Sequence, residues 1–194
     1  MLITVEGIDG AGKTSLAQFL KKKFGFTYFR EPGATPLGEK IREMLLNTPM
    51  YPETELLLFA AARSQFVAEK LRPALEEGHV LLDRYIDSTM AYQGYGLGID
   101  RTFIRQLNSQ ATGGLQPQLT LLLDLPVEVA MSRLPATNDR IESRGKNFFS
   151  LVREGYLITA KANPERFEVL DATLPMETLF QQAEDIISKR IKGN

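Results

Sequence analysis

Residues 2–24 have the sequence LITVEGIDGAGKTSLAQFLKKKF, and this stretch decides the fold. Residues 2–5 are apolar, residues 7–14 are glycine-rich, and residues 15–24 place apolar side chains at helical spacing. A strand, a loop of the pattern G-x-x-x-x-G-K-T and a helix, in this order, are typical of a phosphate-binding loop. We therefore predict that these residues open a nucleotide-binding α/β domain.

Each residue type in the loop has its own physical task. Glycines let the backbone N–H groups approach phosphate oxygens, and the following helix adds its positive end. Lys13 supplies a point charge to the β- and γ-phosphates, and the Thr14 hydroxyl is a ligand for Mg²⁺. The residues predicted to bind the ATP phosphates are Gly7, Ile8, Asp9, Gly10, Ala11, Gly12, Lys13, Thr14 and Ser15. The alternative is a glycine-rich turn that binds nothing.

The composition excludes several classes of protein. A net charge of −1 gives no basic field for nucleic acid, so we expect no nucleic-acid partner. The absence of cysteine excludes disulfides, thiolate metal sites and cysteine nucleophiles. No signal peptide and no apolar run of about 20 residues is present, so we expect a cytoplasmic protein without a membrane partner.

Short apolar segments alternate with helical ones along the chain. We predict strands at residues 2–6, 26–30, 79–83, 119–124 and 167–171. We predict helices at 13–24, 36–47, 53–77, 101–111, 126–134, 146–162 and 175–191, with Pro73 kinking or ending the third. Such alternation predicts a doubly wound, five-stranded parallel sheet flanked by helices, forming one α/β domain over residues 1–194.

Ligands of such sheets bind beyond the carboxyl ends of the strands. Four of the five predicted strands end at a carboxylate, so we expect these groups to converge. Asp83 is a candidate for holding Mg²⁺ through water, and Arg84 for clamping an acceptor phosphate by two hydrogen bonds. A local ion pair at a strand end is the alternative interpretation.

A possible base site lies on the predicted helix 53–77. Phe59 and Arg63 are four residues apart on one helical face, where a ring can stack on a base and a guanidinium can bond its edge. From spacing alone, packing of Phe59 in the core is favoured. The role of Tyr92 and Gln93 is equally undecided from spacing, because an isolated Tyr-Gln pair lies in a surface loop in most proteins.

The polar segment 135–146 lies between two predicted helices and contains Arg140, Arg144 and Lys146. Phosphoryl transfer needs positive charge on the migrating group and exclusion of water, and a closing basic lid supplies both. Arg133, at the end of the preceding helix, belongs to the same group. The alternative is a solvated interhelical loop.

These motifs together resemble those of the thymidylate kinases over residues 2 to about 190. The resemblance rests on the segments 5–14, 30–33, 59–63, 83–93, 139–142 and 171–173. The pattern D-R-Y-x-x-S-x-x-A-Y-Q at 83–93 is specific to this family within the phosphate-loop kinases. The resemblance implies a magnesium-dependent dTMP kinase that makes ADP and dTDP for dTTP synthesis. It also implies a homodimer, in which the apolar face of helix 53–77 could be the contact; this face could equally belong to the core.

The resemblance also implies residue roles. Phe59 stacks on thymine and Arg63 bonds its edge; Tyr92 lies under the deoxyribose; Arg84 and Arg42 hold the dTMP phosphate; Thr173 lies beside adenine. The predicted acceptor residues are Asp9, Glu31, Pro32, Arg42, Phe59, Arg63, Arg84, Ser88, Tyr92 and Gln93, and the predicted metal ligands are Thr14 and Asp83. The predicted catalytic residues are Lys13, Asp9, Arg84, Arg140 and Arg133.

Two features depart from the family pattern. Members that carry an arginine in the phosphate loop have it at the position of Gly10, so here the lid should supply it, through Arg140 or Arg133. The lid itself has few basic residues, with Pro-Ala-Thr-Asn at 135–138. A kinase of another nucleotide or nucleoside, and a nucleotide-binding regulatory protein of the same fold, are the rival interpretations.

Overall fold

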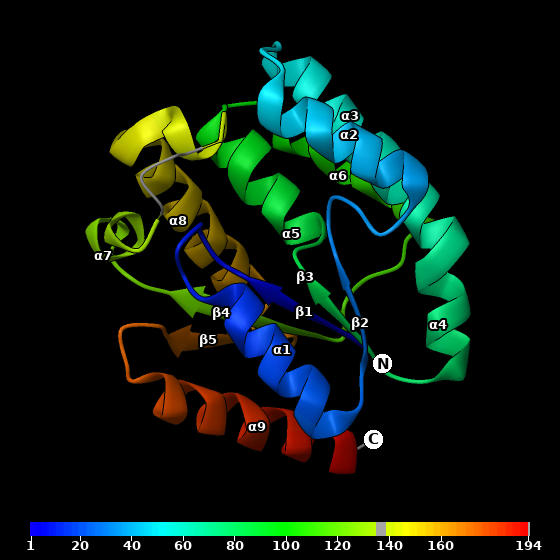
Figure 1. Ribbon diagram of the computed structural model, residues 1–194, viewed down its shortest axis with the longest axis vertical. Coiled ribbons are helices and arrows are strands. Elements are labelled where there is room, and N and C mark those ends of the chain that lie inside the picture. The colour runs from blue at the N-terminus through cyan, green and yellow to red at the C-terminus, as the bar shows by residue number, and fades with distance from the viewer. Residues whose placement is uncertain (135–138, 194) are drawn as a thin grey trace.

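A five-stranded parallel sheet forms the centre of the computed structural model, which describes residues 1–134 and 139–193 (Figure 1). The strands are β1 (Leu2–Glu6), β2 (Thr27–Arg30), β3 (Val80–Asp83), β4 (Leu119–Asp124) and β5 (Phe167–Asp171). They lie in the order β2-β3-β1-β4-β5, and each neighbouring pair is parallel. The predicted fold is thus confirmed, with each strand boundary within one residue of its predicted place.

Helices connect the strands. They are α1 (Lys13–Phe24), α2 (Pro36–Asn47), α3 (Pro52–Phe66), α4 (Arg72–Glu77), α5 (Ile86–Thr89), α6 (Arg101–Thr112), α7 (Val127–Ser132), α8 (Gly145–Ala162) and α9 (Met176–Lys192). Two π-helical turns, η1 (Val67–Leu71) and η2 (Met90–Gly96), and a 3₁₀ turn, η3 (Glu142–Arg144), complete the described elements. No described helix is both long and apolar enough to cross a bilayer.

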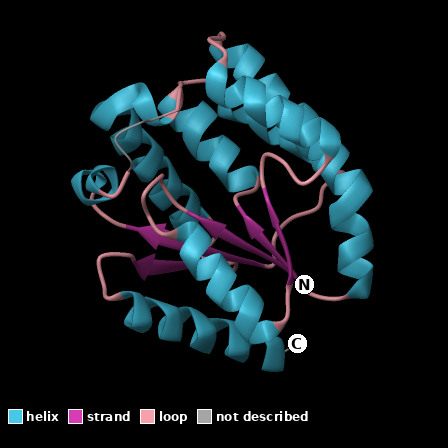
Figure 2. Ribbon diagram, viewed as in Figure 1, coloured by secondary structure: helices cyan, strands magenta, loops and turns pink. Residues whose placement is uncertain are grey.

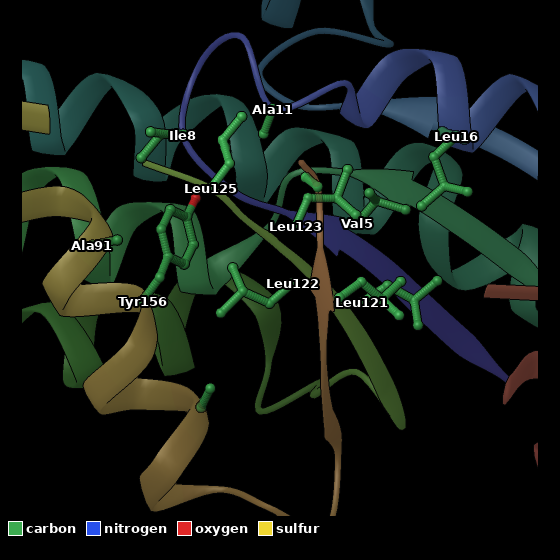
Figure 3. Packing of buried hydrophobic residues seen from close by; sticks show 14 of the residues in the cluster. Val5, Ile8, Ala11, Leu16, Ala91, Leu121, Leu122, Leu123, Leu125 and Tyr156 are labelled. Carbon is green, nitrogen blue, oxygen red and sulfur yellow. The ribbon is translucent and has the colours of Figure 1, made fainter. Parts of the chain in front are cut away.

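Helices cover both faces of the sheet (Figure 2). Ile3 and Val5 of β1 share one core cluster with Leu16 of α1 and with residues of α9. The alternate residue Leu2 lies in a second cluster with residues of α3, η1 and α4. Figure 3 shows part of the first cluster, to which β1 contributes Val5, α1 Leu16, β4 Leu121 and Leu122, and α8 Tyr156. Because the central strands β1, β3 and β4 are covered on both sides, their residues are buried and mostly apolar, whereas the edge strands β2 and β5 are partly exposed.

The predicted helix 53–77 is three contiguous helical segments. The π-turn η1 begins at Val67, before Pro73 is reached. At the end of η1, the backbone N–H of Arg72 donates to the carbonyl of Val67. Pro73 itself lies in the first turn of α4. Because η1 runs directly into α4, Pro73 interrupts helical hydrogen bonding at this point, and the π-turn before it is the local departure from a regular α-helix.

The segment 86–96 is helical, as α5 and η2, although no helix was predicted there. Glycines and hydroxyl residues in this stretch have low helix propensity. Tyr92 and Gln93 are buried within it, so they do not belong to a surface loop. The predicted lid 135–146 is described only from residue 139 onward; residues 135–138 lie outside the described residues.

Candidate active site

The loop between β1 and α1 wraps around the N-terminus of α1. Gly7, Gly10 and Gly12 have φ angles of 143°, 81° and 90°. Such angles favour glycine, which lacks a Cβ. At Gly10 a Cβ would also lie 2.2 Å from the carbonyl oxygen of Ala130 in α7. Close packing against α7 therefore leaves no room for a side chain at this position of the loop.

Two functional side chains follow the loop on α1. The ammonium group of Lys13 donates a 2.8 Å hydrogen bond to the carbonyl of Ile8, and burial lowers the pKa of Lys13 to about 8. The Thr14 hydroxyl donates a 2.7 Å hydrogen bond to Asp83 at the end of β3. A hydroxyl and a carboxylate this close fit Mg²⁺, which takes oxygen ligands, keeps several waters and completes its shell with substrate phosphates.

A charged cluster lies beside the loop. The Arg84 guanidinium donates to the Asp9 carboxylate, which also accepts a 2.8 Å hydrogen bond from the Tyr92 hydroxyl. Arg84 also donates to the Ser88 hydroxyl at 3.2 Å. Burial alone would raise the pKa of Asp9, but the charges of Arg84 and Lys13 outweigh it and lower that pKa below its usual value. Asp9 is therefore a carboxylate at neutral pH.

A pocket next to this cluster extends from the loop toward α2 and α3. We call it the acceptor pocket; it is lined by all ten residues predicted to bind the acceptor, together with Leu45, Leu46, Thr89, Asp139, Ile141 and Glu142. A second pocket, the phosphate pocket, is lined by loop residues with Thr14 and Asp83. The residues that line both are Asp9, Glu31, Arg42, Arg84 and Glu142. The two pockets therefore meet at one shared wall.

Arg63 forms the floor of the acceptor pocket and is almost fully buried. Its guanidinium donates to Glu31 at 2.7 Å, to Thr89 at 2.8 Å, to Asn108 at 2.7 Å and to the carbonyl of Tyr85 at 3.1 Å. These bonds use four of its five N–H groups and leave one on Nη2. Among the described residues, Oε1 of Glu31 is buried without a hydrogen-bond partner. The pocket thus keeps polar capacity for a ligand.

Comparison with known proteins identifies the family of this chain. The sequence model of the family described as Thymidylate kinase matches residues 5–183. The chain belongs to the thymidylate kinase family. Curated thymidylate kinases of Desulforudis audaxviator and Kosmotoga olearia are 48% and 45% identical, over 89% and 94% of this chain and 83% and 92% of their own lengths. The crystal structure of thymidylate kinase from Ehrlichia chaffeensis has a TM-score of 0.79 and 33% identity, and the match covers 97% of this chain and 98% of that one.

Arg140 and Arg133, the two candidates for the catalytic arginine of this thymidylate kinase family member, line neither pocket. Arg140 donates to Glu55 at 2.6 Å and to the carbonyl of Leu45 at 2.9 Å. Both terminal nitrogens of Arg133 donate to the carbonyl of Ala172 at 3.2 Å, next to the predicted adenine residue Thr173. The catalytic role of Arg140 and Arg133 stays a prediction. To act on a bound phosphate, either side chain would have to leave these contacts.

Among the loop residues, Gly7, Ile8 and Ala11 are buried under the loop and support it, whereas Gly10, Gly12 and Ser15 line the phosphate pocket. Thr173 lies apart from both pockets, where its backbone and hydroxyl bond Asp171. The adenine role of Thr173 therefore stays a prediction as well.

The sequence analysis assigned no role to Glu55, which in the structure binds two arginines of the lid segment. Its side chain is fully buried and accepts hydrogen bonds from Gln93, Arg140 and Arg144. A signal was available, because Glu55, Phe59 and Arg63 follow one another at a spacing of four and so share one helical stripe. Near the start of a helix, however, a glutamate is commonly explained by the helix dipole alone.

Proposed function

We propose that this chain transfers the γ-phosphoryl group of ATP to dTMP, giving ADP and dTDP, as one step of dTTP synthesis. The observation that supports this best is the wall shared by the two pockets, with Asp9, Arg42 and Arg84 between a phosphate-loop pocket and a pocket containing Phe59 and Arg63. A donor and an acceptor bound in these pockets would meet phosphate to phosphate. This is the geometry that in-line phosphoryl transfer requires.

Each side chain then has a positioning or charge-stabilising task. Arg84 and Arg42 hold the acceptor phosphate, and Lys13 holds the β- and γ-phosphates of the donor. The acceptor phosphate is already anionic, so no general base is needed. Rate enhancement comes from alignment and from positive charge on the migrating group. Asp9, bonded to Arg84 and Tyr92, keeps both side chains in place beside the sugar.

The remaining acceptor residues select the nucleoside. Phe59 stacks on the thymine ring, Arg63 bonds its edge through the free Nη2 proton, and Tyr92 packs under the deoxyribose and disfavours a 2′-hydroxyl. Glu31, Pro32, Ser88 and Gln93 complete the pocket. On the donor side, Thr173 would pack beside adenine, and Arg133, which bonds the neighbouring carbonyl of Ala172, is one candidate for the catalytic arginine.

Mg²⁺ is the cofactor we propose, held by Thr14 and, through water, by Asp83. When bound, it neutralises charge on the β- and γ-phosphates. The 2.7 Å hydrogen bond between these two side chains supports the assignment, because it brings their oxygens to one point beside the loop. Both residues also line the phosphate pocket.

We further propose a cytoplasmic homodimer of single-domain subunits spanning residues 1–194, each with a lid at about 135–146. Exposed apolar side chains on α3 and α6, Leu57 and Phe103, support a contact on this side of the molecule. In Figure 1, α2, α3 and α6 lie together, away from α1 and α9.

ADP release in a coupled assay tests the function. With ATP and Mg²⁺, we expect fast release with dTMP, slower release with dUMP and none with thymidine. Release with thymidine or AMP in place of dTMP would assign the chain to another acceptor. Binding of ATP with no release for any acceptor would instead support the rival view, a nucleotide-binding regulatory protein.

A further inference from the structure

One buried carboxylate joins the acceptor pocket to the lid segment. Glu55, in the first turns of α3, has a side-chain exposure of 0%. It contacts three side chains from two other parts of the chain: Gln93 of η2, and Arg140 and Arg144 of the lid segment. A carboxylate accepts hydrogen bonds but does not donate them, so its partners must all present N–H groups.

This requirement fixes the orientation of one amide. The side chain of Gln93 is 2.8 Å from Glu55, and only its Nε2 can donate to that carboxylate. Its oxygen, Oε1, must therefore point the other way. Gln93 lines the acceptor pocket, and no donor to Oε1 is found among the described residues. The Gln93 amide therefore presents its oxygen, a hydrogen-bond acceptor, to the acceptor pocket.

Arg140 and Arg144 favour the ionised form of Glu55. Arg140 donates to Oε2 at 2.6 Å, and Arg144 donates to both carboxylate oxygens. Burial by itself would raise the pKa of Glu55, but the hydrogen bonds and charge of Arg144, together with the hydrogen bonds of Gln93 and Arg140, outweigh it, so that the pKa lies below its usual value. A protonated Glu55 could donate a bond to a flipped amide, and the arginines prevent that protonation.

Resting on the proposed function, we infer that Glu55 is a specificity-determining positioning residue: it holds the Gln93 amide with its oxygen toward the acceptor base. The pocket then offers this acceptor together with the one remaining N–H donor of Arg63. Their complement is a base edge with a carbonyl beside a ring N–H, as in thymine and uracil. Cytosine presents an unprotonated ring nitrogen beside an amino group, the opposite pattern.

The substitution Glu55→Gln tests this inference. The new amide keeps the size of the side chain but adds an NH₂ donor, so the Gln93 amide can turn and offer its own NH₂ to the pocket. We expect the ratio of kcat/KM for dTMP to that for dCMP to fall at least tenfold. Loss of lid contacts slows both substrates together and cancels in this ratio. Glu53→Gln, at an exposed glutamate two residues earlier in α3, is the matched control and should leave the ratio unchanged.

A double-mutant cycle shows whether the effect passes through the amide. In a Gln93→Ala background, Glu55→Gln should leave the dTMP-to-dCMP ratio unchanged within about twofold. The inference is overturned if Glu55→Gln alone leaves the ratio unchanged while the protein is active, or if it shifts the ratio equally with and without Gln93. A wild-type protein with no dTMP turnover at all would instead contradict the proposed function.

A direct measurement covers the case in which Glu55→Gln fails to fold. In ¹⁵N-labelled wild-type protein, the NH₂ group of Gln93 should exchange slowly with solvent, because it is bonded to Glu55. Fast exchange of this group, comparable with that of the exposed Gln110, would overturn the inference.

Discussion

At the scale of single residues, Arg84 is the group on which the two pockets meet. It contacts Asp9, Ser88 and the carbonyl of Gly7, and its own φ angle is 72°, in the left-handed region. A non-glycine residue adopts this conformation at a cost of about 1 kcal/mol, so the surrounding contacts must hold it there. The strained backbone and the shared wall both indicate a functional side chain.

We expect Arg84→Ala to lower kcat/KM for dTMP by roughly 100-fold or more, because a charged donor to the acceptor phosphate is lost. The coupled ADP assay with dTMP measures the change. Arg105→Ala removes an exposed arginine of α6 and serves as the control. A loss of only a few-fold at Arg84 would exclude the phosphate-clamp role.

Glu6 is a second residue whose chemistry depends on its surroundings. It is fully buried and accepts bonds from the N–H of Tyr85 at 2.7 Å, from Ser88 at 2.6 Å and from Tyr156 at 2.9 Å. Burial, and then the charge of Asp87, raise the pKa of Glu6 to about 7. A carboxyl with a raised pKa in the folded state stabilises the protein most at low pH.

We therefore expect the free energy of unfolding to fall by about 2 kcal/mol between pH 5 and 7.5 through Glu6 alone. Over this range the unfolded chain has already lost the proton, whereas the folded protein loses it only near its raised pKa. Denaturant unfolding of the wild type and of Glu6→Gln across pH measures the difference. Parallel pH profiles for the two proteins would show that Glu6 does not titrate in this way.

At the scale of elements, the phosphate loop depends on its neighbour α7. The loop backbone is shaped by glycines at positive φ, but Gly10 is the position where the carbonyl of Ala130 leaves no space for a Cβ. The helical segment 86–96 depends on its neighbours in the same way. Its buried residues Tyr92 and Gln93 face the pocket because α8 packs along η2.

We expect Gly10→Ala to lower the free energy of unfolding by at least about 3 kcal/mol and to weaken ATP binding, because the loop must move away from α7. Gly98→Ala is the matched control: Gly98 also has a positive φ, 76°, but nothing lies within 4 Å of its added Cβ. That control should cost only about 1 kcal/mol, the penalty for the backbone conformation. Equal losses for the two variants would contradict the steric explanation.

At the scale of the whole molecule, the α3 side is exposed in a way that suits a second subunit. Leu57 is 52% exposed and Phe103 of the neighbouring α6 is 45% exposed. We propose that these side chains are buried against a second copy of the chain in the homodimer.

We expect light scattering coupled to size exclusion to give the mass of a dimer for the wild type and of a monomer for Leu57→Glu, because a charge would be buried in the interface. Leu151→Glu, at an exposed position of α8 with 47% exposure, is the control and should remain dimeric. A monomeric wild type, or a dimer that Leu57→Glu leaves intact, would rule out this contact.

The resemblance to the thymidylate kinases, and not a local pattern, predicted the ten named residues of the acceptor pocket. The sequence by itself determined the sheet, the phosphate loop and the polar ends of the strands. These features depend on local patterns: apolar strands of a few residues, glycines at fixed spacing, and polar residues at strand ends, which parallel packing brings together. Only the tertiary structure decided the helical state of 86–96, the partners of Arg140 and Arg133, and the place of Glu55. These depend on contacts between residues far apart in the chain, such as Glu55 with Gln93 and Arg144, and no local pattern specifies which distant N–H groups will meet one buried carboxylate.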